Sequence, residues 1–199
     1  MMFRKRRESV EADFYPDGSL LRCPLWFTID ESRRHVFLSK FIYSFASNSR
    51  VFVSWLNSGD MEEEQFSFVK ALDLDFIKNK VPGSKGMIYD VMFECKDYKD
   101  LALFVRDFWH RGYTHIFVLD RNVDVNKLLD LSTIREKSEN ETLDTYLPEG
   151  LTSLLITMPD WVNLMIVTRI SNSRKIVQTL KELCDLFLIE FKNLNPADL

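Results

Sequence analysis

The segment 87–121 constrains the fold more than any other part of the chain, because it reads in order as a strand, a helix and a second strand. β-Branched and aromatic residues fill 87–95. Apolar residues then recur at helical spacing over 96–110, at Leu101, Phe104, Val105, Phe108 and Trp109. Gly112 marks the end of the helix, and 114–119 reads as the second strand. A unit of this length favours parallel strands that are neighbours in one sheet, joined by a right-handed crossover.

The segments on either side of this unit supply further secondary structure. Strands are expected at 20–29, 50–56, 66–77, 151–157 and 161–170, and helices at 35–46, 125–131 and 174–190. Pro24 places the first of these strands towards a sheet edge, since proline cannot donate a ladder hydrogen bond. Asp30 is the expected cap of the first helix, and Met158-Pro159-Asp160 the expected turn of a hairpin. Strand 66–77 is expected to pair with 87–95, across the loop at Val81-Pro82-Gly83.

These elements predict an α/β protein with one mixed β-sheet of about five or six strands and helices packed on it. The chain has 199 residues, of which 46% are hydrophobic and 16 are Phe, so it can bury a sizeable core. We expect an N-terminal tail at 1–13 and a single α/β domain at 14–199. The segment 132–150 is polar, acidic and poor in apolar residues, and is expected to be a surface loop within that domain.

Charge and cysteine content narrow the classes of function. The formal net charge of −4 disfavours non-specific nucleic-acid binding, which needs clustered Lys and Arg. Three widely spaced cysteines without Cys/His ligand spacing read as buried free thiols in a reducing compartment, so we expect a cytoplasmic protein. No apolar run approaches ~18 residues, so no membrane partner is expected. Glycine loops that cradle phosphates are absent as well, and no cofactor is expected.

One arrangement of side chains could carry chemistry. Asp75, for which Asp73 on the same face could substitute, precedes the strand that ends in Glu94-Cys95-Lys96. An acidic residue followed by Glu-x-Lys on the next strand resembles the PD-(D/E)xK nucleases, and the resemblance covers roughly 66–119. It implies that Asp75 and Glu94 hold a divalent ion, Mg²⁺ or Mn²⁺, while Lys96 orients or activates the attacking water on a nucleic acid. The other interpretation is a solvated strand end at which Lys96 pairs with a neighbouring carboxylate.

The acidic run at Glu62, Glu63 and Glu64 supports a different function. Such a run could steer association with a basic partner. We therefore favour a cytosolic protein-binding or inhibitory module that masks a basic surface of a partner protein, in the manner of toxin-neutralising immunity proteins. The alternative is the metal-dependent nuclease, or a catalytically inactive relative of it.

Overall fold

The computed structural model describes residues 7–57, 62–80, 89–107, 113–124, 147, 149–157 and 163–195. The helix expected at 125–131, the turn expected at 158–160 and nearly all of the loop expected at 132–150 lie outside the described residues. The organisation as a single domain stays a prediction.

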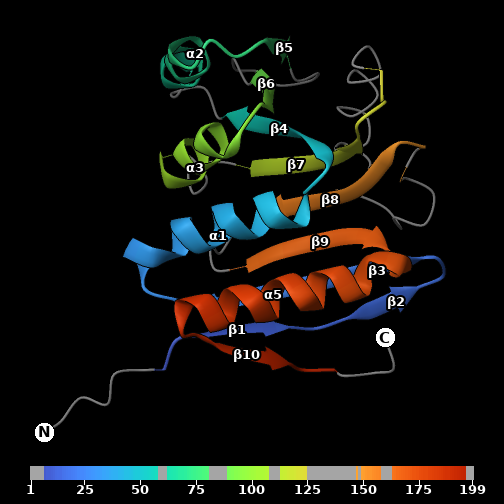
Figure 1. The fold of residues 1–199 in the computed structure, drawn as a ribbon. Helices are drawn as coiled ribbons and strands as arrows, with labels where there is room; N and C mark the ends of the chain where they lie inside the picture. The colour runs from blue at the N-terminus through green and yellow to red at the C-terminus, as the bar shows by residue number, and fades with distance from the viewer. Residues whose placement is uncertain are drawn as a thin grey trace, which may run out of the picture.

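The described strands form one ten-stranded mixed sheet, so the protein is α/β as expected, although the sheet is larger than predicted (Figure 1). The order across the sheet is β10-β1-β3-β9-β8-β7-β4-β6-β5, and β2 pairs with β3 beside this path. β1 and β10 are parallel, while every other described pair is antiparallel. The strands are β1 (Ser9–Ala12), β2 (Tyr15–Asp17), β3 (Leu20–Thr28), β4 (Ser49–Asn57), β5 (Phe76–Lys80), β6 (Tyr89–Cys95), β7 (Tyr113–Asp120), β8 (Leu151–Thr157), β9 (Asn163–Arg169) and β10 (Glu190–Asn193).

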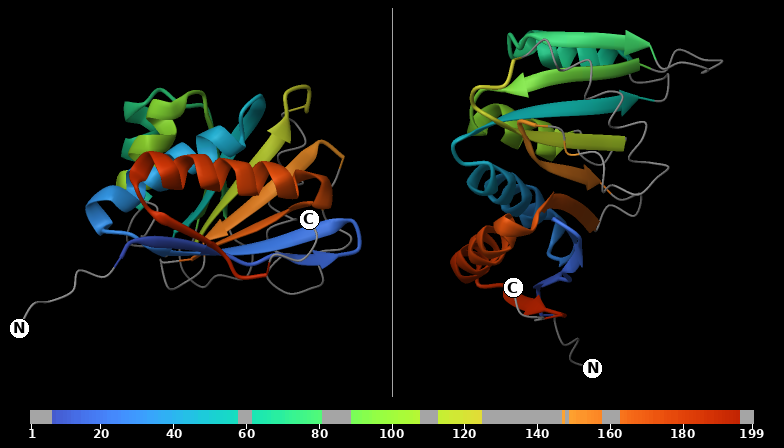
Figure 2. Two further views of the ribbon diagram at one scale, coloured as in Figure 1. Left: turned by 60° about the horizontal axis from the view of Figure 1, so that its bottom comes forward. Right: turned by 90° about the vertical axis from the view of Figure 1, so that its right-hand side faces the viewer.

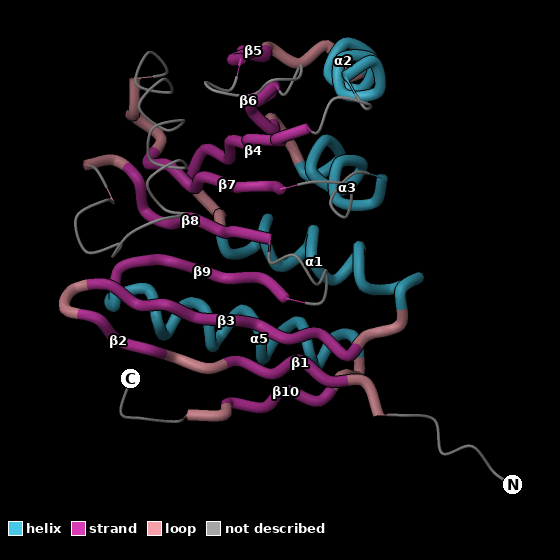
Figure 3. The backbone as a smooth tube through the Cα atoms, turned by 180° about the vertical axis from the view of Figure 1, so that it is seen from behind, coloured by secondary structure: helices cyan, strands magenta, loops and turns pink. Residues whose placement is uncertain are grey.

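The described helices lie together on one face of this sheet (Figure 2). They are α1 (Glu31–Phe45), α2 (Glu62–Ala71), α3 (Tyr98–Asp107) and α5 (Ser173–Phe187), the last preceded by the 3-10 turn Ile170–Asn172. When the sheet is seen from behind, its strands lie in front of α1 and α5 (Figure 3). α1 contacts both α3 and α5, and the main hydrophobic core fills the space between helices and sheet. A second, smaller cluster that includes Phe52, Phe117 and Leu154 lies on the opposite face.

The predicted neighbour relation within 87–121 is wrong. β6 and β7 both pair with β4, each in antiparallel orientation, so they run in the same direction with β4 between them. β4 is buried continuously from Val51 to Trp55. A strand that is apolar on both faces suits the interior of a sheet, where both of its hydrogen-bonding edges are used.

The edge position predicted for β3 is also wrong, because β3 lies between β9 on one side and β1 and β2 on the other. The backbone N–H of Asp13 donates to the carbonyl of Pro24 at 3.2 Å. Pro24 has no N–H to donate in return. The ladder breaks at this point, since β1 ends at Ala12 and β2 begins at Tyr15. Pro24 therefore lies within a continuous central strand, opposite a gap in the pairing between β1 and β2.

The expected strand over 66–77 is wrong for its first half, which forms the end of α2, whereas the predicted pairing with 87–95 is confirmed by β5 and β6. The alternation of Leu72, Asp73 and Leu74 comes from the helix end. Asp73 has φ of 51°, its N–H donates to the carbonyl of Lys70, and the N–H of Leu74 donates to the carbonyl of Val69. These two hydrogen bonds form a Schellman motif at the end of α2. The alternation of polar and apolar residues there therefore belongs to a helix terminus and not to a strand.

The tail predicted at 1–13 is wrong for Ser9–Ala12, which form β1 between β3 and β10. Val10 and Ala12 are fully buried. Residues 1–6 lie outside the described residues.

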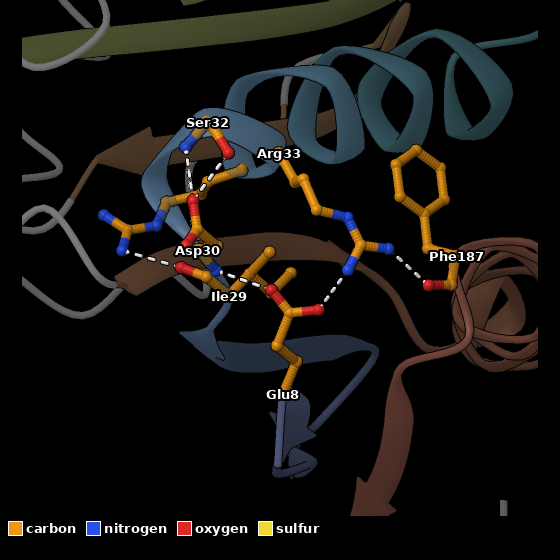
Figure 4. Close-up of polar contacts among 7 residues, drawn as sticks. Glu8, Ile29, Asp30, Ser32, Arg33 and Phe187 are labelled. Atoms are coloured by element: carbon orange, nitrogen blue, oxygen red, sulfur yellow. Dashed lines mark hydrogen bonds and ion pairs between the residues drawn. The ribbon is translucent and has the colours of Figure 1, made fainter. Parts of the chain in front are cut away.

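Polar contacts of Glu8 and Arg33 tie this N-terminal strand to α1 and α5 (Figure 4). One carboxylate oxygen of Glu8 accepts the N–H of Asp30 at 2.8 Å, and the other pairs with Arg33. Arg33 also donates to the carbonyl of Phe187, at the end of α5, where the helix dipole favours a cation. Asp30 caps α1 as predicted, accepting the N–H of Ser32 at 3.0 Å.

Candidate functional site

Glu94, a predicted metal ligand, is engaged by an arginine on the neighbouring strand. Glu94 on β6 pairs in register with Phe52 of β4, and Arg50 lies two residues before Phe52 on the same face. The Nε and Nη2 groups of Arg50 donate to the two carboxylate oxygens of Glu94 at 2.7 and 2.8 Å. The side chains are 22% and 28% exposed, so this is a partly buried bidentate ion pair.

Other contacts fix Arg50 in this position. Its Nη1 donates to the carbonyl of Val123 at 3.0 Å, and its guanidinium carbon lies 5.0 Å from the centre of the Phe52 ring. The hydrogen bonds to Glu94 raise the pKa of Arg50, and partial burial offsets only part of that effect. Arg50 therefore stays charged, and both oxygens of Glu94 are occupied by its guanidinium.

The other two predicted catalytic residues lie near each other. Asp75 immediately precedes β5 and Lys96 immediately follows β6, and the Lys96 Nζ is 3.9 Å from a carboxylate oxygen of Asp75. The Asp75 side chain is fully exposed and that of Lys96 is 56% exposed, so the contact is a loose surface pair. Asp73, the possible substitute, is exposed in the turn after α2. Among the described residues, no three His, Cys, Asp or Glu side chains group as potential metal ligands.

The predicted binding residues Glu62, Glu63 and Glu64 begin α2. Glu63 is exposed, while the side chains of Glu62 and Glu64 lie outside what the structure describes. The helix is anchored one turn later, where Gln65 donates its side-chain N–H to the carbonyl of Trp55 at 3.1 Å. Phe68 then packs its ring against the rings of Trp55, Phe93 and Phe104.

A cavity of about 360 Å³ lies at the end of the sheet where β6 and β7 finish and β4 begins. Its walls come from the end of α1, the turn into β4, the junction of β6 with α3 and the residue after β7. The lining residues are Tyr43, Ala46, Ser47, Asn48, Ser49, Val51, Cys95, Lys96, Asp97, Leu101 and Arg121. Sequence reasoning singled out Lys96 but missed Arg121 and Asn48. The sequence gives no local signal for them, because they meet Lys96 only through the order of the strands.

The sequence matches no protein-family model. Among curated proteins it is similar to Kelch-like protein 7 of Gallus gallus and of Homo sapiens, each 27% identical over 112 residues. The alignment covers 52% of this chain and 19% of either relative, so the chain spans about a fifth of the length of the curated relatives that it matches. In the part of the chain that the structure describes, no helix is long and apolar enough to cross a membrane.

Proposed function

We propose that this chain is a protein-binding or inhibitory module that masks a basic surface of a partner protein, as toxin-neutralising immunity proteins do. The observation that carries the proposal is the position of the acidic first turn of α2. The helix lies at the β5 end of the sheet (Figure 1), and its exposed Glu63 belongs to the run Glu62, Glu63 and Glu64. A run of carboxylates at the outer end of the molecule suits contact with a cationic surface.

The anchoring of α2 strengthens this argument. Gln65 is fully buried and bonded to the backbone of β4, and Phe68 packs among aromatic rings of the core. These contacts fix the position of the first turn of α2 relative to the core. A preorganised surface loses less conformational entropy on binding than a flexible segment does.

The cysteines support a cytoplasmic location as part of this proposal. Cys23, Cys95 and Cys184 are free thiols. Burial is the main cause that raises the pKa of each, to about 12 for Cys184, so these groups stay protonated and poorly reactive at neutral pH. Unpaired cysteines of this kind are typical of proteins in reducing compartments.

Neutralising the acidic turn tests the proposal. A partner captured from the native cell is first purified, and association rates are then measured by surface plasmon resonance at low and high salt. The triple variant Glu62→Gln, Glu63→Gln, Glu64→Gln is expected to slow association by about tenfold at low salt and to change dissociation little. A matched control neutralises three exposed carboxylates outside α2, by Glu31→Gln, Asp185→Asn and Glu190→Gln. If neither the salt concentration nor the α2 substitutions change the association rate, this turn does not steer association.

The alternative, a PD-(D/E)xK-like nuclease or an inactive relative of one, is favoured by a single observation, the 3.9 Å approach of Lys96 to Asp75. The ion pair of Glu94 with Arg50 acts against metal binding there, because a metal ion would have to displace a bidentate guanidinium. We therefore expect no heat of binding when Mg²⁺ or Mn²⁺ is titrated into the protein, and no cleavage of DNA or RNA. Saturable metal binding that Glu94→Ala abolishes would establish the alternative instead.

A further inference from the structure

We propose that the cavity at the ends of β6 and β7 binds a small organic phosphate monoester, whose phosphate is held by Lys96 and Arg121. This site is separate from the acidic turn of α2 and does not depend on the protein-binding function proposed for it.

The topology brings the walls of the cavity together at one end of the sheet. β6 and β7 run in the same direction with β4 between them, so their carboxyl ends lie at the same end of the sheet. The chain leaves β6 there and enters α3, and both Lys96 and Asp97 from this junction line the cavity. The positive end of the dipole of α3 adds to the attraction for an anion.

The charges in the cavity favour an anion. Among the described residues that line the cavity, Lys96 and Arg121 carry positive charge and Asp97 carries negative charge. Asp97 is the N-terminal cap of α3, and its carboxylate accepts the backbone N–H of Asp100 at 3.0 Å. Asp100 in return accepts the N–H of Lys96 at 3.1 Å, which fixes the junction. Burial raises the pKa of the Cys95 thiol, so the cysteine in the lining adds no negative charge.

Arg121 is positioned for this task by the turn before β4. Its Nη2 donates to the side-chain oxygen of Asn48 at 3.0 Å, and Asn48 holds a left-handed backbone conformation with φ of 68° that asparagine tolerates. This bond uses one of the five N–H groups of the guanidinium. The planar fork of arginine suits two-point contact with phosphate oxygens. Lys96 supplies a mobile ammonium, since its only described ion pair, with Asp75, is loose.

The size and the remaining walls indicate that the ligand carries an organic group. A volume of about 360 Å³ falls at the lower end of the range of small-molecule pockets, roughly 300–1,000 Å³. Ala46, Val51 and Leu101 give apolar lining. Tyr43, half-exposed, contributes a ring that forms a T-shaped contact with Tyr98, with 5.5 Å between the ring centroids. A planar group on the ligand could pack against the Tyr43 ring.

The test uses adenosine monophosphate as a representative organic phosphate monoester. Inorganic phosphate and adenosine are titrated separately, to probe the phosphate and the organic group of the ligand one at a time. Binding is followed by isothermal titration calorimetry and by amide chemical shifts, in buffer with chelator so that no metal contributes. Adenosine monophosphate is expected to bind with a sub-millimolar Kd and to shift the amides of Asn48, Lys96 and Arg121. Inorganic phosphate should shift the same amides more weakly, and adenosine should not.

Variants decide whether these residues form the site. Arg121→Gln and Lys96→Gln are each expected to weaken binding by about tenfold or more, in line with loss of a charge-assisted contact. Lys181→Gln, which removes an exposed cation on α5, should leave it unchanged. Tyr43→Ala should weaken the nucleotide but not inorganic phosphate. Unchanged unfolding midpoints show that the variants fold. The proposal is overturned if neither phosphate probe shifts these amides at millimolar concentration, or if binding survives both Arg121→Gln and Lys96→Gln.

Discussion

Replacing Phe104 by alanine is expected to lower the free energy of unfolding by ~3–5 kcal/mol, because it removes a large aromatic side chain from a packed core and leaves a cavity. Phe104 lies on α3 and is fully buried. Its ring meets those of Trp55 and Phe93 at 5.5 Å between centroids and that of Phe68 at 6.1 Å. This one side chain therefore joins α3 to α2 and to the strands β4 and β6.

The measurement is urea denaturation followed by circular dichroism, with the variant Lys99→Ala as control. Lys99 lies on the same helix but is exposed, so its replacement by alanine should change stability by less than about 0.5 kcal/mol. Phe104→Ala should lower the midpoint while leaving the slope of the transition unchanged. Equal midpoints for the two variants would mean that α3 does not pack inward as the structure has it.

Phe104 also illustrates what could be predicted from the sequence. Its place on the buried face of a helix follows from spacing alone, and so does the buried face of α5. The pairing of β8 with β9 follows from two apolar runs joined by the short turn sequence Met158-Pro159-Asp160. These features depend on residues close together along the chain, and local periodicity reports them well.

The misassigned elements depend on distant partners or on unusual backbone conformation. The insertion of β4 between β6 and β7 cannot be read from the strand–helix–strand segment, because that segment does not include β4. Pro24 would indicate an edge strand if its missing N–H required a side of the strand with no neighbour. Here β3 has neighbours on both sides, and the pairing with β1 and β2 is interrupted opposite Pro24. Asp73 mimics strand alternation because a Schellman motif reverses the chain there.

The same limit applies to the candidate site. The sequence places Glu94 and Lys96 at the end of one strand, and in the structure Glu94 lies in β6 while Lys96 directly follows it. It does not show that Arg50, 44 positions earlier, lies diagonally across from Glu94 on β4 and donates to both of its carboxylate oxygens. Glu94, which the motif selects as a metal ligand, therefore has a structural partner in Arg50 that only the order of the strands reveals.

The Arg50–Glu94 pair should accordingly contribute to stability. Its two side chains are less than a third exposed, so solvent screens them less than it screens a surface pair. Removing either partner leaves the other charge partly buried without its counterion, and such losses exceed the net value of the pair itself. Arg50→Ala additionally removes the hydrogen bond to the carbonyl of Val123 and the contact with the Phe52 ring, so it should cost more than Glu94→Ala.

A double-mutant cycle measures this coupling. Each single substitution, Arg50→Ala or Glu94→Ala, is expected to lower the free energy of unfolding by about 1–3 kcal/mol, with a favourable coupling of about 1–2 kcal/mol between them. The exposed pair of Lys96 with Asp75 serves as the control cycle, for which the coupling should be below about 0.5 kcal/mol. Additive effects of Arg50→Ala and Glu94→Ala would mean that the two charges do not stabilise each other in solution. Glu94 would then be available for other ligands, and the expectation of no Mg²⁺ binding at this strand end would lose its physical basis.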